Sequence, residues 1–179
     1  MFTLEQKQIL LSLAREAVET YLRTGEIIDK KFTDPALNQR VGAFVTIYKN
    51  GGLRGCLGLT QSDEPLFKTV INMAVAASTE DPRFNPVEKN ELQNLEYEIS
   101  ILTPFKKVKS WKEIEINKHG VMVKQKGKSG LFLPQVAKEN DWDIKTFLTI
   151  LCQEKAGLPG DAWQNPQTEL LVFEAEVIK

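Results

Sequence analysis

The sequence predicts one globular domain that combines helices with strands. Its 179 residues fit a single domain, and a chain of this length buries roughly 70% of the surface that its unfolded form exposes. Segments with apolar residues at helical spacing alternate with segments rich in β-branched and aromatic residues. No internal repeat and no linker interrupts them, so we expect residues 1–179 to form a single domain.

Composition and charge argue against several classes of protein. The chain is 42% hydrophobic and 26% charged, with a formal net charge of -1 and a pI near 6.0. A disordered chain would be less hydrophobic, and a nucleic-acid-binding domain would be strongly basic. Residues 1–22 lack the basic and apolar regions of a secretory signal, and no stretch approaches the ~20 apolar residues that span a bilayer. With only two cysteines, we expect a cytoplasmic protein without membrane contact.

The first 60 residues predict a helix followed by a hairpin. Thr3 to Gln6 form a capping box, apolar residues then recur at helical spacing, and Gly25 ends the helix. This helix could bind a partner, but we expect it to pack on the chain's own core. Asn50-Gly51 predicts a tight turn between a strand that begins near residue 41 and a second strand at about 53–58.

After residue 60 we expect both helices and strands. Before residue 104 we expect a helix that begins at Pro65, a short helix at 89–95 and a strand at 97–103. After residue 104 we expect strands at 120–123 and 131–133, followed by a turn or short helix from Pro134. A helix should then begin at Asp141 or Asp143 as its N-cap and end at Gly157, and a final strand should cover 170–178. Cys152 falls on the inner face of that last helix and is expected to be a buried apolar residue.

A lysine-rich stretch covers residues 105–128, with eight lysines and two glutamates. The stretch could form a patch for a polyanion such as a nucleic acid. Lysines also protect the edges of sheets from pairing with other strands. Because the lysines do not alternate with aromatic residues in a pattern that suggests base stacking, we prefer the second interpretation.

The segment Leu53 to Gly58, which reads LRGCLG, is the main candidate for a catalytic site. In a regular strand Arg54 and Cys56 share one face, with their Cα atoms ~6.6 Å apart. Gly55 and Gly58 would let a ligand or another backbone approach closely. A guanidinium ~6 Å from the sulfur would lower the pKa of the thiol from ~8.5 to between ~6.5 and ~8. Arg54 and Cys56 are therefore the candidate catalytic residues.

A nucleophilic enzyme also needs a base and an oxyanion site. His119, the only histidine, is the only possible partner of a Cys–His pair, although a turn histidine without such a role is the simpler reading. No GxSxG, GxGxxG or GxxxxGK[ST] motif occurs, so no nucleotide cofactor is indicated. Two cysteines and one histidine are too few for a closed structural zinc site, and we expect no metal and no cofactor.

A second polar cluster lies at Glu80 to Phe84, which reads EDPRF. Asp81 and Arg83 could project together to bind a polar ligand or to clamp the cysteine segment. They could also form an internal salt bridge that pins an irregular loop. A guanidinium suits carboxylate and phosphate groups because its planar fork binds them through two hydrogen bonds.

These segments resemble the AMMECR domain family. RGCLG, EDPRF, EISILTPF, HGVMV, LFLPQVA, Trp142-Asp143 and KAGLP occur in the order typical of the family, from about Lys7 to Val177. Among prokaryotic members the chain looks most like the stand-alone AmmeMemoRadiSam system protein A form. The resemblance implies an α+β fold of two unequal, closely packed subdomains with mostly antiparallel sheets and flanking helices. It also implies a cleft between the subdomains near the RGCLG strand.

The resemblance also implies partners and site residues. Genes of this form accompany a Memo-like protein and a radical SAM protein. The residues that match the family's motifs are Arg54, Gly55, Cys56, Gly58, Asp81, Arg83 and Phe84. We therefore expect an accessory module that binds a partner or an unidentified small ligand. The alternatives are an enzyme with Cys56 as nucleophile or covalent carrier, activated by Arg54, and a nucleic-acid-associated module.

Overall fold

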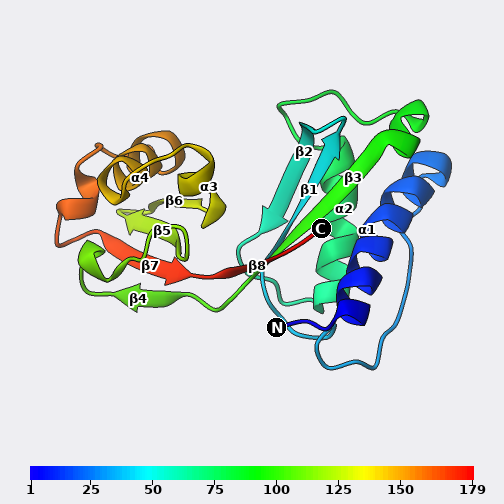
Figure 1. Ribbon diagram of the computed structural model, residues 1–179, viewed down its shortest axis with the longest axis horizontal. Helices are drawn as coiled ribbons and strands as arrows, with labels where there is room; N and C mark the ends of the chain where they lie inside the picture. Colours follow the sequence, from blue (N-terminus) through cyan, green and yellow to red (C-terminus); the bar gives the residue numbers. More distant parts are fainter. The chain divides into compact units, whose positions relative to one another are not determined.

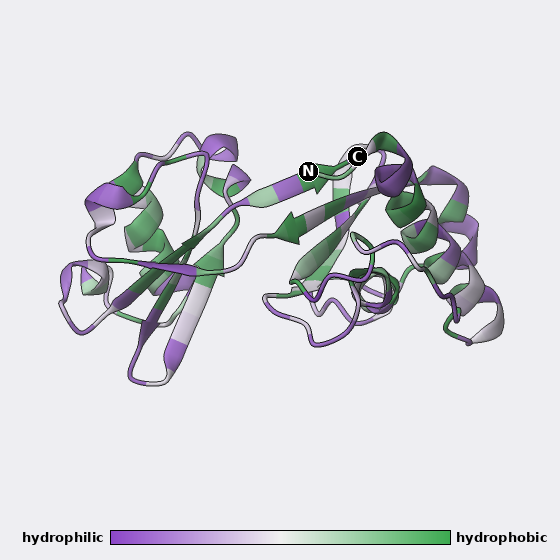
Figure 2. Cartoon of the chain, turned by 90° about the horizontal axis from the view of Figure 1, so that it is seen from below, coloured by the Kyte–Doolittle hydropathy of each residue, from purple (hydrophilic) through white to green (hydrophobic).

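The computed structural model describes residues 1–179, which divide into two compact units (Figure 1). Unit 1 comprises Met1–Leu102 and Glu176–Lys179, and unit 2 comprises Thr103–Ala175. Each unit contains a four-stranded sheet with helices, so the predicted α+β class is confirmed. Figure 2 shows hydrophobic residues along the helices and strands of both units, whereas hydrophilic residues dominate the connecting loops. That the whole chain acts as one domain stays a prediction.

Unit 1 contains a sheet in the order β2-β1-β3-β8. Its strands are β1 (Ala43–Lys49), β2 (Gly52–Leu59), β3 (Leu95–Leu102) and β8 (Ala175–Ile178). The helices α1 (Leu4–Thr24) and α2 (Leu66–Thr79) supply the apolar residues that pack on alternate residues of β1 and β3. The 3-10 helix η1 (Lys89–Asn94) leads into β3. Because the helices cover one face, the side chains on the opposite face of the sheet, such as Thr46 and Glu98, do not belong to this core.

Local predictions for unit 1 are confirmed. Thr3 and Gln6 form the capping box of α1, and Gly25 ends the helix with a φ of 79°. The inner face of α1 is buried in the core of unit 1, as expected for a helix that packs on its own chain. Asn50 and Gly51 form the hairpin turn with φ angles of 51° and 76°.

Unit 2 contains a sheet in the order β4-β7-β5-β6. Its strands are β4 (Lys106–Val108), β5 (Gly120–Gln125), β6 (Lys128–Phe132) and β7 (Glu169–Phe173). Helices α3 (Gln135–Glu139) and α4 (Ile144–Ile150), the π-helical turn η3 (Leu151–Lys155) and the 3-10 turns η2 (Trp111–Glu113) and η4 (Ala162–Gln164) complete the unit. Cys152 is fully buried in this core, as predicted.

The final segment differs from its prediction. We expected one strand at 170–178, but it forms β7 and β8, which belong to different sheets. The two strands are separated at Glu174, whose N–H binds the Thr103 hydroxyl at 2.8 Å and whose carbonyl accepts from the Thr103 N–H at 2.9 Å. A hydrophobic pattern does not reveal which sheet a strand joins, since pairing partners are set by contacts remote in sequence.

Candidate functional site

The candidate site lies on β2, the edge strand of the unit 1 sheet. On β1, Ile47 lies opposite Gly55, but the next residue lies opposite Leu53, so Arg54 has no partner across the pair. Arg54 is therefore the extra residue of a β-bulge. A bulge bends its strand and re-aims the side chains around it. The regular alternation that places Arg54 beside Cys56 consequently does not hold.

Arg54 binds the loop that precedes β3. Its Nε and Nη2 donate to the two Glu91 carboxylate oxygens at 3.0 and 2.8 Å. Its Nη1 and Nη2 donate to the backbone carbonyls of Asn85 and Pro86 at 2.8 and 3.2 Å. The side chain is only 16% exposed, and its guanidinium holds the pKa of Glu91 at about 2. The expectation that Arg54 stands beside the sulfur and activates it is therefore wrong, because the Glu91 carboxylate and two backbone carbonyls bind its guanidinium instead.

Cys56 lies opposite Thr46 of β1, with its thiol half-buried. The Thr46 hydroxyl is a hydrogen-bond donor to Sγ at 3.2 Å. Burial raises the pKa of Cys56, and this effect outweighs the Thr46 hydrogen bond and the charge of Arg83, which both lower it. The carboxylates of Asp81 and Glu98 raise the pKa further. At neutral pH the thiol is protonated, so the sulfur is a poor nucleophile.

Asp81 and Arg83 bind the open edge of β2 where another strand would pair. The Cys56 N–H donates to Asp81 Oδ2 at 2.8 Å, and Arg83 Nη2 donates to the Cys56 carbonyl at 3.3 Å. These two bonds replace the pair that a neighbouring strand would make, which protects the edge. Since the Cys56 backbone faces outward, Cys56 and Thr46 are a non-hydrogen-bonded pair, in which side chains approach closely. We call this arrangement of Asp81 and Arg83 the edge clamp.

Arg83 combines a fixed guanidinium with an exposed face. Its Nε and Nη2 donate to Asp81 Oδ1 and Oδ2 at 2.9 and 2.7 Å, and its guanidinium carbon lies 5.5 Å from the centre of the Phe84 ring. The Asp81 side chain is 2% exposed, whereas that of Arg83 is 53% exposed. Arg83 holds the pKa of Asp81 at about 2. Guanidinium groups carry five N–H donors, and the bonds to the Asp81 carboxylate and to the Cys56 carbonyl use those on Nε and Nη2.

The glycines of the motif allow close packing within unit 1. A Cβ on Gly55 would lie 2.0 Å from the Ala77 carbonyl oxygen of α2. A Cβ on Gly58 would lie 2.3 Å from the Phe44 ring. The prediction that another backbone approaches this segment is confirmed for Gly55, and both glycines bring β2 close to its neighbours.

A buried polar row crosses the sheet on the face opposite the helices. Thr46 lies opposite Cys56 on β2 and opposite Glu98 on β3. Glu98 is buried, and Lys179 Nζ binds its carboxylate at 2.8 Å. Sequence reasoning missed Thr46 and Glu98. The predicted hairpin register could have indicated Thr46, but no local signal places β3 beside β1.

Other candidates from the sequence lie elsewhere or lack a site. His119 belongs to unit 2, where its Nδ1 accepts from the Glu115 N–H at 3.0 Å. No group of three or more histidine, cysteine, aspartate or glutamate side chains is placed to hold a metal ion. None of the helices is long and apolar enough to cross a membrane. The eight lysines of residues 105–128 are exposed on unit 2, and two of them pair with glutamates, Lys107 with Glu169 and Lys118 with Glu115.

The fold is that of an α+β protein whose edge strand β2 carries the RGCLG motif. Comparison with known proteins shows the family to which the chain belongs. Residues 11–178 match the model of the AMMECR1 family, and the chain belongs to that family. It is 41% identical to Protein MK0488 of Methanopyrus kandleri over 99% of this chain and 89% of that protein. It is 40% identical to Protein NEQ441 of Nanoarchaeum equitans over 95% of this chain and 98% of that protein.

A solved structure has the same fold. The crystal structure of the uncharacterized protein PH0010 from Pyrococcus horikoshii superposes with a TM-score of 0.91 and 38% sequence identity. The match covers 97% of this chain and 90% of that chain. The AMMECR-like fold implied by the sequence motifs is therefore confirmed.

Proposed function

We propose that this chain is a cytoplasmic accessory module that acts with a Memo-like protein and a radical SAM protein, and that the edge clamp on the RGCLG strand binds the partner. One observation carries the proposal. The Arg83 guanidinium is held by a buried carboxylate while half of its side chain stays exposed. A recognition group that is already fixed loses little conformational freedom when it binds.

The chemistry of the clamp favours an acidic contact. The Arg83 side chain is 53% exposed, and a guanidinium binds carboxylate or phosphate oxygens with matched geometry. Phe84 packs beside the guanidinium and adds an apolar surface to the same patch. The partner surface that fits is an acidic side chain flanked by apolar residues.

Replacing Arg83 by glutamine is expected to weaken association with the partners at least about tenfold, because a hydrogen-bonded charge pair is lost. The measurement is the dissociation constant for the Memo-like and the radical SAM protein of the same organism, each titrated into this chain. Arg40→Gln is the matched control, since Arg40 is exposed and remote from the clamp in sequence. Equal affinities of the two variants would move the interface to another surface.

The alternative is an enzyme that uses Cys56. The hydrogen bond from Thr46 to the sulfur and the charge of Arg83 favour it, because both stabilise a thiolate. Burial disfavours the thiolate and is the larger effect, so the pKa of Cys56 is raised. Site-specific alkylation of Cys56, followed by mass spectrometry, separates the two functions.

The alkylation rate of Cys56 is expected to stay low at neutral pH and to rise only above the ~8.5 of a free thiol. Its pKa is raised, so the folded protein has a smaller thiolate fraction at pH 7 than the unfolded chain. Arg83→Gln removes a positive charge near the sulfur and should raise the pKa further. The same protein in denaturant is the reference. An apparent pKa below ~7.5 in the folded state would favour the enzyme instead.

A further inference from the structure

The open edge of β2 extends past the residue that the edge clamp binds. In an antiparallel pair, successive residues turn their backbone N–H and C=O alternately toward the partner strand and away from it. Cys56 and Gly58 lie opposite Thr46 and Phe44 without a shift of register between them, and the clamp shows that the Cys56 backbone faces outward. The Gly58 backbone therefore faces outward as well. Since no strand follows β2 in the sheet, Gly58 offers a donor and an acceptor to a strand from outside.

Apolar side chains flank this part of the edge on both faces of the sheet. Gly58 is partly exposed, and the Phe44 ring lies so close to it that a Cβ on Gly58 would be 2.3 Å from the ring. Leu59 points to the opposite face and is 41% exposed. The side chains of an added strand would thus find an apolar contact on either face.

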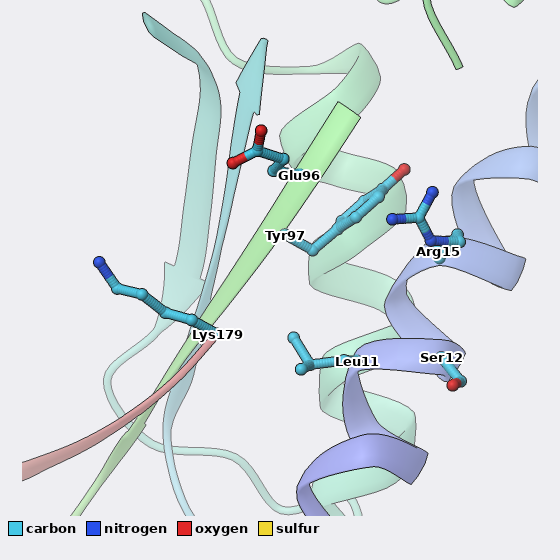
Figure 3. Close-up of a pocket in the computed structure, with 6 residues that line it drawn as sticks. All are labelled: Leu11, Ser12, Arg15, Glu96, Tyr97 and Lys179. Atoms are coloured by element: carbon cyan, nitrogen blue, oxygen red, sulfur yellow. The ribbon is translucent and has the colours of Figure 1, made fainter. Parts of the chain in front are cut away.

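Charged side chains occupy the other side of the same sheet, at the start of β3 and the end of β8. Arg15 Nη2 donates to the Leu95 carbonyl at 3.4 Å. Figure 3 shows the Arg15 side chain pointing from α1 toward β3, with Glu96 on β3 and Lys179 at the end of β8. Charged side chains at an edge discourage pairing with a further strand. The edge of β2 at Gly58 is therefore the better place for a strand from outside.

We propose that the partner of the edge clamp adds an extended segment to β2 at Gly58 and places an acidic side chain of that segment on Arg83. This inference rests on the function proposed for the clamp and specifies how the partner is recognised. One segment can make both contacts, because Arg83 binds the carbonyl of Cys56, which is two residues or ~6.6 Å from Gly58. Backbone hydrogen bonds then supply affinity, and the side chains supply specificity.

The acidic contact favours a different protein over a second copy of this chain as the source of the strand. The half-exposed guanidinium of Arg83 calls for a carboxylate. The sequence of β2, GLRGCLGL, contains no aspartate or glutamate, so β2 of a second copy would not supply one.

Amide hydrogen exchange followed by NMR tests the strand addition. In the free chain the protection factor of the Gly58 N–H is expected to be at least about tenfold lower than that of Leu57, whose backbone faces β1. Adding the Memo-like or the radical SAM protein should raise the protection of Gly58 at least about tenfold and leave Gly51, in the hairpin turn, unchanged. Equal protection of Gly58 and Leu57 in the free chain would mean that the edge is already closed. A complex in which Gly58 exchanges as in the free chain would exclude strand addition.

Two exposed leucines of β2 give a matched pair of variants on either side of Cys56. Leu59 is 41% exposed and lies beside the proposed segment, whereas Leu53 is 42% exposed and lies on the side where Arg54 binds its loop. Leu59→Glu should weaken association with the partner about tenfold, because it places a negative charge beside an acidic segment. Leu53→Glu should bind like the wild type.

The outcomes separate this inference from the function on which it rests. If Leu59→Glu binds as tightly as Leu53→Glu while Arg83→Gln binds more weakly than the wild type, the clamp recognises its partner without an added strand and only the inference is wrong. If Arg83→Gln also binds like the wild type, or if neither partner associates with the wild type, the proposed function fails and the inference fails with it.

Discussion

Replacing Gly55 by alanine is expected to lower the free energy of unfolding by about 3 kcal/mol. The added Cβ would lie 2.0 Å from the carbonyl oxygen of Ala77, and that oxygen belongs to the backbone of α2. Neither side can rotate away, so the strand or the helix must move. Urea denaturation followed by circular dichroism measures the loss.

Gly52→Ala on the same strand is the matched control for Gly55→Ala. A Cβ on Gly52 would lie 3.5 Å from the nearest atom, the Lys49 carbonyl oxygen, which is an ordinary contact. Its effect should stay within ~0.5 kcal/mol. Equal stabilities of the two variants would show that β2 does not pack against α2 as closely as described.

Asp81→Asn is expected to destabilise the protein by about 2 kcal/mol at pH 7. The Asp81 carboxylate accepts from the backbone N–H of Cys56 and from the backbone and side chain of Arg83. These bonds lower its pKa from 3.8 to about 2. We expect less than the full linkage energy, since solvent weakens an ion pair whose arginine is half exposed.

The pH dependence of stability gives the sign of the Asp81 effect. A carboxylate with a lowered pKa stabilises the fold above its unfolded pKa near ~4, and this contribution disappears as the pH falls through about 2. The difference in unfolding free energy between wild type and Asp81→Asn should therefore be largest above pH ~5 and shrink toward pH ~2. Asp63→Asn, an exposed position, should give no such difference. A constant difference across this range would contradict the charge-based account.

Much of the fold could be predicted because its signals are local. The capping box at Thr3, the turn at Asn50-Gly51 and the glycine at the end of α1 each depend on a few adjacent residues. The division of residues 170–178 between two sheets could not be predicted, because the sheet that each strand joins depends on partners far away in the chain. The N-cap of α4 is Asp143 rather than Asp141, a distinction that local spacing left open.

The candidate site was predicted in its composition but only partly in its geometry. Cys56, Asp81 and Arg83 do come together, and Phe84 packs beside them. Arg54 does not join them, because one extra residue in β2 interrupts the alternation from which its position was predicted. Glu91, the partner of Arg54, lies 37 positions away, and no sequence pattern connects the two.

The central claim is that Asp81 holds the Arg83 guanidinium in the orientation that a partner recognises. Arg83→Lys tests it directly, since lysine keeps the charge but has no planar fork that Asp81 can orient. The measurement is the affinity of this variant for the Memo-like and radical SAM proteins beside that of the wild type. The account predicts that Arg83→Lys binds nearly as weakly as Arg83→Gln. Wild-type affinity of Arg83→Lys would show that charge alone is recognised and would contradict the account.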